Sequence, residues 1–574
     1  MHNGNFVLIL HTHLPWVLHH GTWPHGVDWL NEAVAECYIP LINVFNDLLN
    51  ENIYPKVSLD ISPVLCEQLE HIDFKDVFIS YCDEKIKAGK QDEENFKAWG
   101  YDPHHVYLAQ YWQNWYETRK NEFIYKFNSS IVGALRELQD KGAIEVMTCG
   151  ATHGYLPLLG TDRSVNLQVK AAVENYKKHF GRQPRGIWLP ECAYRPSYNW
   201  KSLLPIAPFH EEHLRPGIEQ FLARHSIEYF VTDEDLTKRA YPIGVYLDVN
   251  KEKFVSINSP AFKFIPGIFE LSPLNLYHIS SSEKVEYGTS IAFTRHHNIA
   301  MQVWSGEMGY PGESNYLDFH KKYLGSMLRY WRVTDNKTDM MYKLLYHPDW
   351  IYEKIDLQAN HFIHHIENTI NFNKKLTGKF GTLCTPFDTE LFGHWWFEGP
   401  EFIRAVLRGL HQSPWVNTAT ASEQILATKP LEVMGLPEGS WGKNNNHDVW
   451  SNDGNKWTWE SIYNNENRLK KIYDLINNTD VNDELRIILT QALREMMLLQ
   501  SSDWQFLIET QSAKDYAEQR FSFHHSDFNK LCDIVEKYIK TKELSDYDKT
   551  FLEVTTKRNS CFAELKFEWW NENI

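Results

Sequence analysis

Short apolar runs alternate with helical patterns along most of this 574-residue chain, and this alternation limits its fold more than any other feature. Stretches such as 164–180 follow the runs and repeat apolar residues near the 3.6 spacing of a helix. The predicted strands cover residues 6–11, 54–62, 143–150, 185–191, 227–233, 290–295, 299–305 and 381–388. Strands that alternate with helices favour an α/β fold in which a parallel sheet closes into a barrel.

Three regions depart from this alternation and indicate how the chain divides. Residues 66–130 are charged, aromatic and mostly helical, which predicts an insertion after the second strand. Residues 241–289 are rich in Pro, Ser and aromatic residues and indicate a long excursion that hangs over the barrel mouth. Helical patterns such as 483–500 dominate from about residue 415, and a chain of this length needs two or three cores. We therefore predict a barrel from residues 1–65 and 131–414, an inserted helical domain at 66–130, and a C-terminal helical domain at 415–574.

The composition is that of a globular protein and excludes several kinds of partner. Hydrophobic residues make up 43% and charged residues 23% of the chain. The formal net charge of -17 argues against a nucleic-acid or anionic-membrane partner, because both need clustered cations. The sequence shows neither 18 consecutive apolar residues nor a signal-peptide pattern. Its eight cysteines form no CxxC motif, so we expect reduced thiols in a cytoplasmic protein.

Tryptophan gathers in short runs beside His, Asp and Glu. The chain has 21 Trp, and examples of these runs are HTHLPW (11–16), GHWWFEG (393–399) and SSDW (501–504). Large domains also bury Trp for packing alone. An aromatic face, however, packs on the C–H face of a pyranose while polar neighbours bond the sugar hydroxyls. The pattern therefore favours a carbohydrate ligand.

Two histidines, His11 and His13, follow the first predicted strand, and such a pair allows three roles. They could bind a metal, contact a sugar or fill a core. The spacing suits a metal, but zinc sites combine His with Asp and no carboxylate follows this pair. Imidazoles can also donate hydrogen bonds to glucose hydroxyls. Other predicted strands end in the same way, where the chemistry of a parallel barrel sits, at Cys149 to His153, Glu191, Trp304 and Asp388.

Acidic residues occupy two of these strand ends. Glu191 in WLPECAY directly follows an apolar run, and PFDTELFGHWWFEG supplies Asp388, Glu390 and Glu398. Two carboxylates from different strand ends are what glycosidic-bond chemistry needs, because one attacks the anomeric carbon while the other transfers a proton. The alternative is that each acid caps a helix or forms a salt bridge. Their position among Trp and His favours the catalytic interpretation.

A set of long motifs follows one order along the chain. They are HTHLPW (11–16), CGATHGYLPLL (149–159), IWLPECAYRP (187–196), QVWSGEMGYPG (302–312), FDTELFGHWWFEGP (387–400) and SSDW (501–504). Together they resemble glycoside hydrolase family 57, and most of all its 1,4-α-glucan branching enzymes. The resemblance implies a (β/α)7 barrel with a helical insertion and a C-terminal α-helical domain that contributes to the active site. It also implies a retaining mechanism on α-1,4-glucans such as amylose or glycogen, with no metal or other cofactor.

The resemblance assigns roles to individual residues. Glu191 matches the nucleophile and Asp388 the general acid/base, so we expect their carboxyls roughly 5–5.5 Å apart, as a covalent intermediate requires. His11, His13 and His153 match histidines that line the donor-sugar subsite. The other matches to substrate-contacting positions are Arg295, Gly312, Trp441 and Asp503, with Trp304 and Trp504 as stacking walls.

Some stretches depart from the family pattern on the acceptor side. Residues 241–289 are longer than their counterpart, and only Tyr277 and Tyr287 are candidates for the tyrosine of the family's active-site loop. RHHN (295–298) and GKNNNHDVW (442–450) replace acidic, Pro- or Gly-bearing patterns, and Asn in place of Gly narrows backbone freedom. These departures bear on branching more than on the catalytic pair.

The sequence leaves several functions open. The first is a branching enzyme that transfers a cleaved chain to a glucose 6-hydroxyl. An α-amylase or 4-α-glucanotransferase of the same family would use water or a 4-hydroxyl as the acceptor. A metal-dependent deacetylase-like or mannosidase-like barrel would hold its metal at His11 and His13. A non-catalytic glucan-binding protein is disfavoured because Glu191 and Asp388 are both present. We expect a monomer or a small homo-oligomer.

Overall fold

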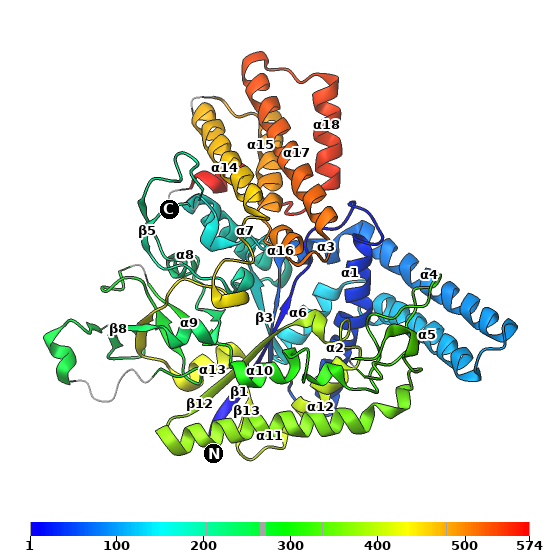
Figure 1. Ribbon diagram of the computed structural model, residues 1–574. Helices are drawn as coiled ribbons and strands as arrows, with labels where there is room; N and C mark the ends of the chain where they lie inside the picture. Colours follow the sequence, from blue (N-terminus) through cyan, green and yellow to red (C-terminus); the bar gives the residue numbers. More distant parts are fainter. Residues whose placement is uncertain are drawn as a thin grey trace.

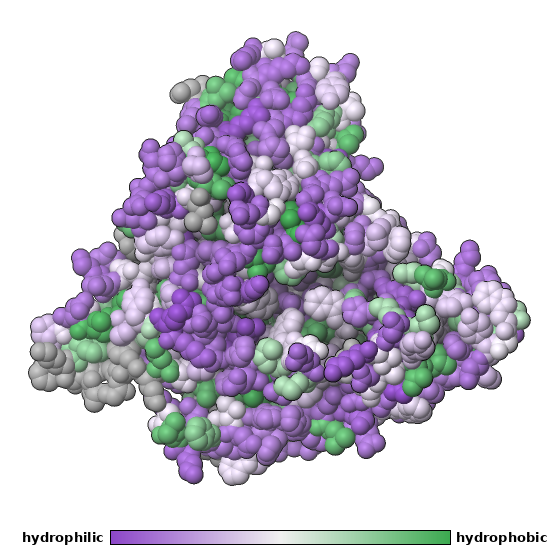
Figure 2. All heavy atoms as spheres, viewed as in Figure 1, coloured by the Kyte–Doolittle hydropathy of each residue, from purple (hydrophilic) through white to green (hydrophobic). Residues whose placement is uncertain are grey.

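The computed structural model describes residues 2–572 with the exception of 203, 252, 265–270, 287, 336 and 478. Figure 1 shows a central barrel wrapped by helices, with a helical bundle above it, a helical hairpin on one side and a small sheet on the other. On the face drawn in Figure 2, hydrophilic residues predominate and hydrophobic residues are scattered in small groups. Among the described helices, none combines the length and the apolar character needed to cross a membrane.

Parallel strands form the barrel. In their order around it they are β1 (Gly4–Thr12), β2 (Val57–Ile61), β3 (Ile144–Cys149), β4 (Gly186–Trp188), β7 (Tyr229–Thr232), β11 (Ser290–Thr294) and β12 (Gly381–Asp388). β12 pairs in parallel with β1, and a parallel bridge between Arg295 and Cys384 joins β11 to β12. The ring is therefore closed, and the predicted (β/α)7 barrel is confirmed.

Side chains alternate in direction along β1, and this alternation decides what enters the barrel. Val7 and Ile9 pack inside with Trp188 and other inward residues of the ring. Phe6, Leu8 and Leu10 instead pack against the outer helices. Because both faces are buried, the strand reads as one continuous apolar run. His11 is the next residue in the inward row.

Helices between the strands cover the outside of the barrel. They are α2 (Ile39–Asn50), α6 (Ile131–Asp140), α7 (Asp162–Phe180), α8 (Ile218–Arg224), α11 (Tyr352–Thr377) and α12 (Gly399–His411). Helix α7 shows how local sequence sets these limits. The Thr161 side chain accepts a hydrogen bond from the backbone N–H of Ser164 at its start, and Gly181 adopts a left-handed conformation at its end.

One predicted strand is a helix. Residues 299–305 belong almost entirely to α10 (His297–Trp304). Ile299, Ala300 and Val303 are buried on one face, which is helical spacing. The short apolar run suggested a strand, but such a run does not distinguish a strand from a buried helix. Trp304 therefore ends a helix and not a strand.

Two additions flank the barrel. Helices α4 (Ile72–Ala98) and α5 (Pro103–Asn121) form a hairpin that projects to the right in Figure 1. On the other side, β10 (Tyr277–Ile279) pairs with β11 and extends the sheet away from the ring. The extension continues through β14 (Glu432–Gly435), β8 (Tyr241–Tyr246) and β9 (Phe254–Ser256).

The C-terminal bundle begins later than predicted. Its long helices are α14 (Lys456–Ile476), α15 (Asp483–Leu499), α17 (Lys514–Thr541) and α18 (Asp546–Arg558). Before them, β13 (Val416–Thr418) pairs with β1, and β14 joins the small sheet. A domain boundary at residue 415 therefore assigns β13 and β14 to the C-terminal domain, although both strands pair with strands outside the bundle. Short helix α16 (Asp503–Thr510) lies at the end of the bundle that meets the barrel (Figure 1).

Candidate active site

The carboxyl ends of three neighbouring strands bring polar side chains to one level of the barrel. In the strand register, His11 of β1 stands beside Asp60 of β2 and beside Asp388 of β12. Residues that pair directly in parallel strands share a face, so all three side chains turn inward. His11 Nδ1 lies 2.9 Å from Asp60 Oδ1, and both side chains are buried. The ring of His11 stacks on Trp188 with centroids 4.5 Å apart.

Glu191 enters the same space from a sharp turn after β4. It lies in the 3-10 turn Pro190–Cys192 with a left-handed backbone (φ 62°), which a non-glycine residue adopts only under local constraint. Trp441 Nε1 donates to Glu191 Oε2 at 2.9 Å, and Ser502 Oγ donates to Oε1 at 3.0 Å. Burial raises the pKa of Glu191 to about 7, against the opposing effect of the hydrogen bond from Trp441.

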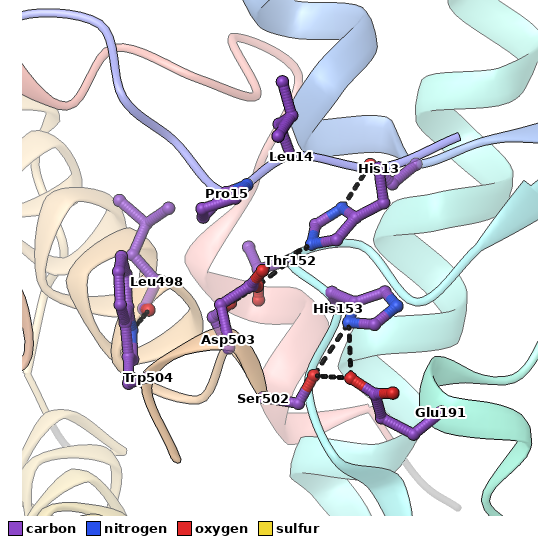
Figure 3. A network of polar contacts seen from close by, with 12 residues as sticks. His13, Leu14, Pro15, Thr152, His153, Glu191, Leu498, Ser502, Asp503 and Trp504 are labelled. Carbon is purple, nitrogen blue, oxygen red and sulfur yellow. Dashed lines mark hydrogen bonds and ion pairs between the residues drawn. The ribbon is translucent and has the colours of Figure 1, made fainter. Parts of the chain in front are cut away.

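The C-terminal bundle contributes the corner between α15 and α16 to this site (Figure 3). The backbone N–H of Ser502 donates to His153 O at 2.9 Å, and Gly154 forms an antiparallel bridge with Ser501. These bonds attach the corner to the loop after β3. Asp503, the next residue, places its carboxylate 2.9 Å from His13 Nε2. The bundle thus supplies one hydroxyl and one carboxylate to the barrel mouth.

All three predicted histidines lie in the site, and each already has protein partners at its ring nitrogens. His13 Nδ1 lies 2.7 Å from Ser62 Oγ, and its other nitrogen faces the carboxylate described above. His153 Nδ1 lies 2.8 Å from Ser502 Oγ, and its Nε2 lies 3.2 Å from His11 Nε2. The rings of His13 and His153 stack at 3.9 Å. A sugar hydroxyl would have to share or displace these partners, so the donor-subsite role stays a prediction.

Acidic side chains crowd around Asp388. Burial raises the pKa of Asp388 well above its ordinary value; the carboxyls of Glu390 and Glu191 add to the shift, and Arg295 opposes it. Burial also raises the pKa of Glu390 to about 7, and the hydroxyl of Tyr38 donates to its Oε1 at 2.5 Å. Like charges so close together cannot all ionise. The arrangement therefore keeps a protonated acid beside a carboxylate, as acid catalysis with a nucleophile requires.

Trp441 connects the predicted aromatic and basic residues. Its ring centroid lies 5.0 Å from that of Trp188 and 6.5 Å from that of Trp304. The guanidinium of Arg295 lies 6.0 Å from the same ring, within cation–π range. Among the described residues, the buried indole N–H groups of Trp188 and Trp304 have no hydrogen-bond partner. Both indole N–H groups therefore border the site without a protein acceptor.

Comparison with known proteins agrees with this geometry. The family model of glycosyl hydrolase family 57 matches residues 7–437, and the model of the C-terminal domain of 1,4-alpha-glucan branching enzymes matches residues 462–570. The chain belongs to glycosyl hydrolase family 57.

Two similar proteins show how far the similarity extends. The 1,4-alpha-glucan branching enzyme of Thermococcus kodakarensis is 37% identical over 567 residues, which cover 98% of this chain and 78% of that protein. Its crystal structure matches with a TM-score of 0.87 over 100% of this chain and 97% of that chain. The α-amylase AmyC of Thermotoga maritima is 26% identical with a TM-score of 0.79, and the match covers 100% of both chains.

The two short stretches that depart from the family 57 pattern meet at Asp233, directly after β7. Arg295 Nη2 lies 2.5 Å from Asp233 Oδ2, and Asn445 Nδ2 donates to Asp233 Oδ1 at 2.9 Å. Asn444 and Asn445 both have positive φ. Asn tolerates this conformation better than most non-glycine residues. Asparagine therefore suits this turn, and the contact of Asn445 with Asp233 holds the loop that carries Trp441.

Gly312 and Trp504 do not join this cluster. Gly312 ends an exposed turn and donates to Gly309 O, so its contact with substrate stays a prediction. Trp504 is fully buried, donates to Leu498 O at 2.9 Å, and has the guanidinium of Arg520 5.0 Å from its ring. Adjacent helical residues point about 100° apart, so Trp504 faces the bundle while its neighbour faces the site. The prediction of a stacking wall at Trp504 is wrong.

The structure describes one of the two tyrosine candidates for the active-site loop. Tyr277 is buried in β10, where its hydroxyl accepts from the backbone N–H of Ser272, so it belongs to the sheet extension and not to a loop. Tyr287 lies outside the described residues.

Sequence reasoning missed several members of the site, and three of them are polar groups close to the catalytic candidates. Asp60 stands in VSLDIS at an inward position of its strand, where the alternation of side chains could have revealed it. Asp233 follows β7 directly, in the same position relative to its strand as the residues that were singled out. Ser502 precedes Asp503 in SSDW, but no local pattern indicates that its hydroxyl reaches Glu191.

A metal alternative can be drawn from the same side chains. His13, His153 and Asp503 offer ligand atoms within 4.8 Å of one another. The carboxylate that the HxH pair lacks in sequence is therefore supplied by the bundle. Hydrogen bonds to Ser62 and Ser502 and between His13 and Asp503 account for the placement of these side chains without an ion.

Proposed function

We propose that this protein is a retaining 1,4-α-glucan branching enzyme. It cleaves an α-1,4-glucan such as amylose or glycogen and transfers the released chain to a glucose 6-hydroxyl. The names of its family 57 relatives and the match to the branching-enzyme C-terminal domain support this reading. The observation that carries it is the convergence of Glu191, Asp388 and the Ser502 corner at one barrel mouth. A cytoplasmic location and a monomeric or small homo-oligomeric state stay predictions.

The first half-reaction uses the two carboxyl groups in different protonation states. The Glu191 carboxylate attacks the anomeric carbon, and the bond from that carbon to the glycosidic oxygen breaks. Asp388 gives its proton to the leaving oxygen, which becomes the free 4-hydroxyl of the departing chain. Trp441 Nε1 donates to Oε2 of Glu191, and the hydroxyl of Ser502 orients the other carboxylate oxygen, Oε1. The product is a glycosyl ester on Glu191.

The second half-reaction releases the ester. Asp388, now a carboxylate, takes the proton of the acceptor hydroxyl while that oxygen attacks the anomeric carbon. The ester bond breaks and Glu191 recovers its charge. A 6-hydroxyl acceptor yields an α-1,6 branch with retained configuration. Trp441 and Arg295 border the acceptor side. Asp233 holds both in place, because it pairs with Arg295 and accepts from Asn445 in the loop that carries Trp441.

The second candidate function is an α-amylase, in which water replaces the sugar acceptor. The structural match to the α-amylase AmyC of Thermotoga maritima, which covers the full length of both chains, supports this second candidate. The two candidates share every step up to the glycosyl ester. They differ only in which acceptor reaches the ester, so product analysis distinguishes them.

The test is proton NMR of amylose incubated with the protein, with Glu191→Gln as the blank. We expect the α-1,6 anomeric signal to grow well ahead of new reducing ends, and both to be absent with the variant. Growth of reducing ends alone would identify an α-amylase instead.

A chelator separates these readings from the metal-dependent alternative. We expect dialysis against EDTA to leave the α-1,6 signal unchanged, because no step above uses a metal. Loss of activity that zinc restores would favour the metal alternative at His13, His153 and Asp503.

A further inference from the structure

The hydrogen bonds around His11 and His153 form one line that ends in a carboxyl group at each end, and His153 Nδ1 also lies 3.8 Å from Glu191 Oε1. Asp60 Oδ1 lies 2.9 Å from His11 Nδ1, and the two Nε2 atoms of His11 and His153 lie 3.2 Å apart. His153 Nδ1 lies 2.8 Å from Ser502 Oγ, which lies 3.0 Å from Glu191 Oε1. Figure 3 shows the end of this line nearest Glu191. The mechanism above uses only that last carboxyl.

Each contact in this line needs one proton. Burial lowers the pKa of both His11 and His153 well below the ordinary value, so both imidazoles are neutral and carry one N–H each. Between the two Nε2 atoms, one ring must donate and the other must accept. The choice at this contact fixes the tautomers of both rings, and through them the direction of the hydrogen bonds on either side.

Only two arrangements satisfy every contact. In the first, Asp60 is protonated and donates to His11 Nδ1; His11 then donates to His153, His153 to Ser502, and Ser502 to an ionised Glu191. In the second, every donor is reversed, so that Glu191 is protonated and Asp60 is ionised. Both contain four protons in the line and one negative charge.

We propose that these five side chains form a proton relay that moves one negative charge between Asp60 and Glu191. When the charge moves to Glu191, the carboxyl O–H of Glu191 breaks as its proton passes to Ser502 Oγ. The Ser502 proton passes to His153 Nδ1, the His153 Nε2 proton to His11 Nε2, and the His11 Nδ1 proton to Asp60. One bond to hydrogen forms for each one that breaks. The inference rests on the proposed function because it takes Glu191 as the nucleophile.

The surroundings of the two carboxyls favour sharing one charge over ionising both. Burial raises the pKa of Asp60 well above its ordinary value, and the carboxyls of Glu390 and Asp388 add to the shift. Burial likewise raises the pKa of Glu191, and the carboxylate of Asp503 adds to the shift, while His13 and the two hydrogen-bond donors oppose it. Two coupled acids of this kind titrate as a pair. Asp60 therefore stores the proton that Glu191 has to lose before it attacks.

The relay predicts opposite effects from its two ends. In Asp60→Asn, no second carboxyl competes for the negative charge, so Glu191 ionises more readily and the acidic limb of the activity profile moves to lower pH. In Ser502→Ala, Glu191 loses a donor that stabilises its ionised form, so the same limb moves to higher pH. A hydrogen bond to a charged group corresponds to a shift of about one to two pH units.

The experiment measures the initial loss of amylose–iodine absorbance from pH 4 to 10 for the wild-type protein and both variants. Asp92→Asn and Ser422→Ala are the matched controls. Asp92 is a buried carboxyl that accepts from Tyr330 at 2.7 Å, and Ser422 donates to Glu145, both away from the site. We expect the controls to leave the limb in place. If both relay variants moved the limb in the same direction, or lowered the rate without moving it, the relay would be wrong.

Neutron diffraction of the deuterated wild-type protein tests the same proposal without a substitution. We expect one deuteron in each of the four contacts and one on each imidazole. Two deuterons on either ring would overturn the relay. Loss of iodine absorbance reports chain cleavage whichever acceptor follows, so absence of the α-1,6 NMR signal would refute branching and leave this test intact.

Discussion

The stretch VLILHTHLPWVLHH carries two pairs of histidines that end in different environments. His11 and His13 enter the barrel mouth, where both contact His153 and where His13 also contacts Asp503. His19 and His20 lie at the joint between the barrel and the C-terminal bundle. His20 Nε2 lies 2.7 Å from Asn559 Oδ1, and His19 Nε2 lies 2.9 Å from Asp73 Oδ2.

Behind the second pair lies a buried polar network that resembles the one at the active site. Asn559 Nδ2 donates to both carboxylate oxygens of Glu495, at 2.8 and 3.0 Å. His524 Nδ1 lies 2.7 Å from Glu495, and Arg520 Nη2 lies 3.1 Å from His524 Nε2. Burial raises the pKa of Glu495 to about 7, as it does for Glu191. The two networks thus combine similar groups with similar electrostatics.

The difference is what the carboxyl can reach. Glu191 lies at the end of its network, its side chain is 12% exposed, and its carboxyl helps to raise the pKa of Asp388. Glu495 is fully buried, and in the described part of the chain its oxygens contact Gln491 and His524 of the bundle and Asn559 of the segment that crosses it. A perturbed pKa alone therefore does not identify a catalytic acid. Access to a ligand and a second carboxyl decide the matter.

The largest expected effect breaks the site network at its end. Glu191→Gln keeps the shape of the side chain and removes the nucleophile, so branching activity should fall by about a thousandfold or more. The denaturation midpoint should change little, because Gln can accept from Trp441 and donate to Ser502. Activity is measured as α-1,6 signal on amylose, with urea unfolding as the control. Retention of a tenth of the activity would exclude Glu191 as the nucleophile.

The second prediction concerns pH and uses Glu495→Gln. The folded-state pKa of Glu495 is raised, so its contribution to stability is present below the unfolded value of 4.5 and is lost as pH rises through about 7. Removing the carboxyl should flatten the fall in stability across this window by about 3 kcal/mol. Activity per folded molecule should keep its pH profile, because Glu495 does not face the site.

Urea unfolding at pH 4.5 and pH 7.5 measures this difference for the wild-type protein and the variant. If Glu495→Gln moved the acidic limb of the activity profile, the Glu495 network would influence catalysis and would not be purely structural.

The barrel was predictable from sequence because its strands are buried on both faces and read as apolar runs. Every strand of the ring falls on a predicted run, and only 299–305 was mistaken, because a short apolar run does not distinguish a strand from a buried helix. The limits of the bundle were less predictable. β13 and β14 are only three and four residues long, so no periodicity marks them.

The site was predictable only in part, for reasons of geometry. Glu191 and Asp388 end strands, and the parallel register brings such residues together. Ser502 comes from a different domain, and its contact with Glu191 depends on how the bundle docks, which no local pattern records. Trp504 shows the converse error, because a motif residue beside a site residue on a helix faces another direction.

The third prediction compares one histidine from each pair. His13→Ala removes the stacking partner of His153 and the bond to Asp503, so the corner that orients Glu191 should shift and lower activity by about a hundredfold. His20→Ala should leave activity per folded molecule unchanged and lower the unfolding free energy by about 2 kcal/mol, because Asn559 loses a buried partner.

Both effects are measured on the same preparations, with branching rates normalised to the folded fraction from urea curves. Equal losses of activity in the two variants would contradict the division between a catalytic and a structural pair.

The smallest effect is expected at His19, which sharpens the comparison within the second pair. The His19 side chain is 27% exposed and its partner Asp73 is 49% exposed, so water replaces their contact when it is lost. His19→Ala should therefore change the unfolding free energy by no more than about 0.5 kcal/mol. His20, one residue further, lies against Asn559 and the ring of His524, which are both fully buried. Urea midpoints of the two single variants measure this difference in unfolding free energy. Equal destabilisation would mean that contact with the bundle, and not burial of the polar partner, determines the loss of stability.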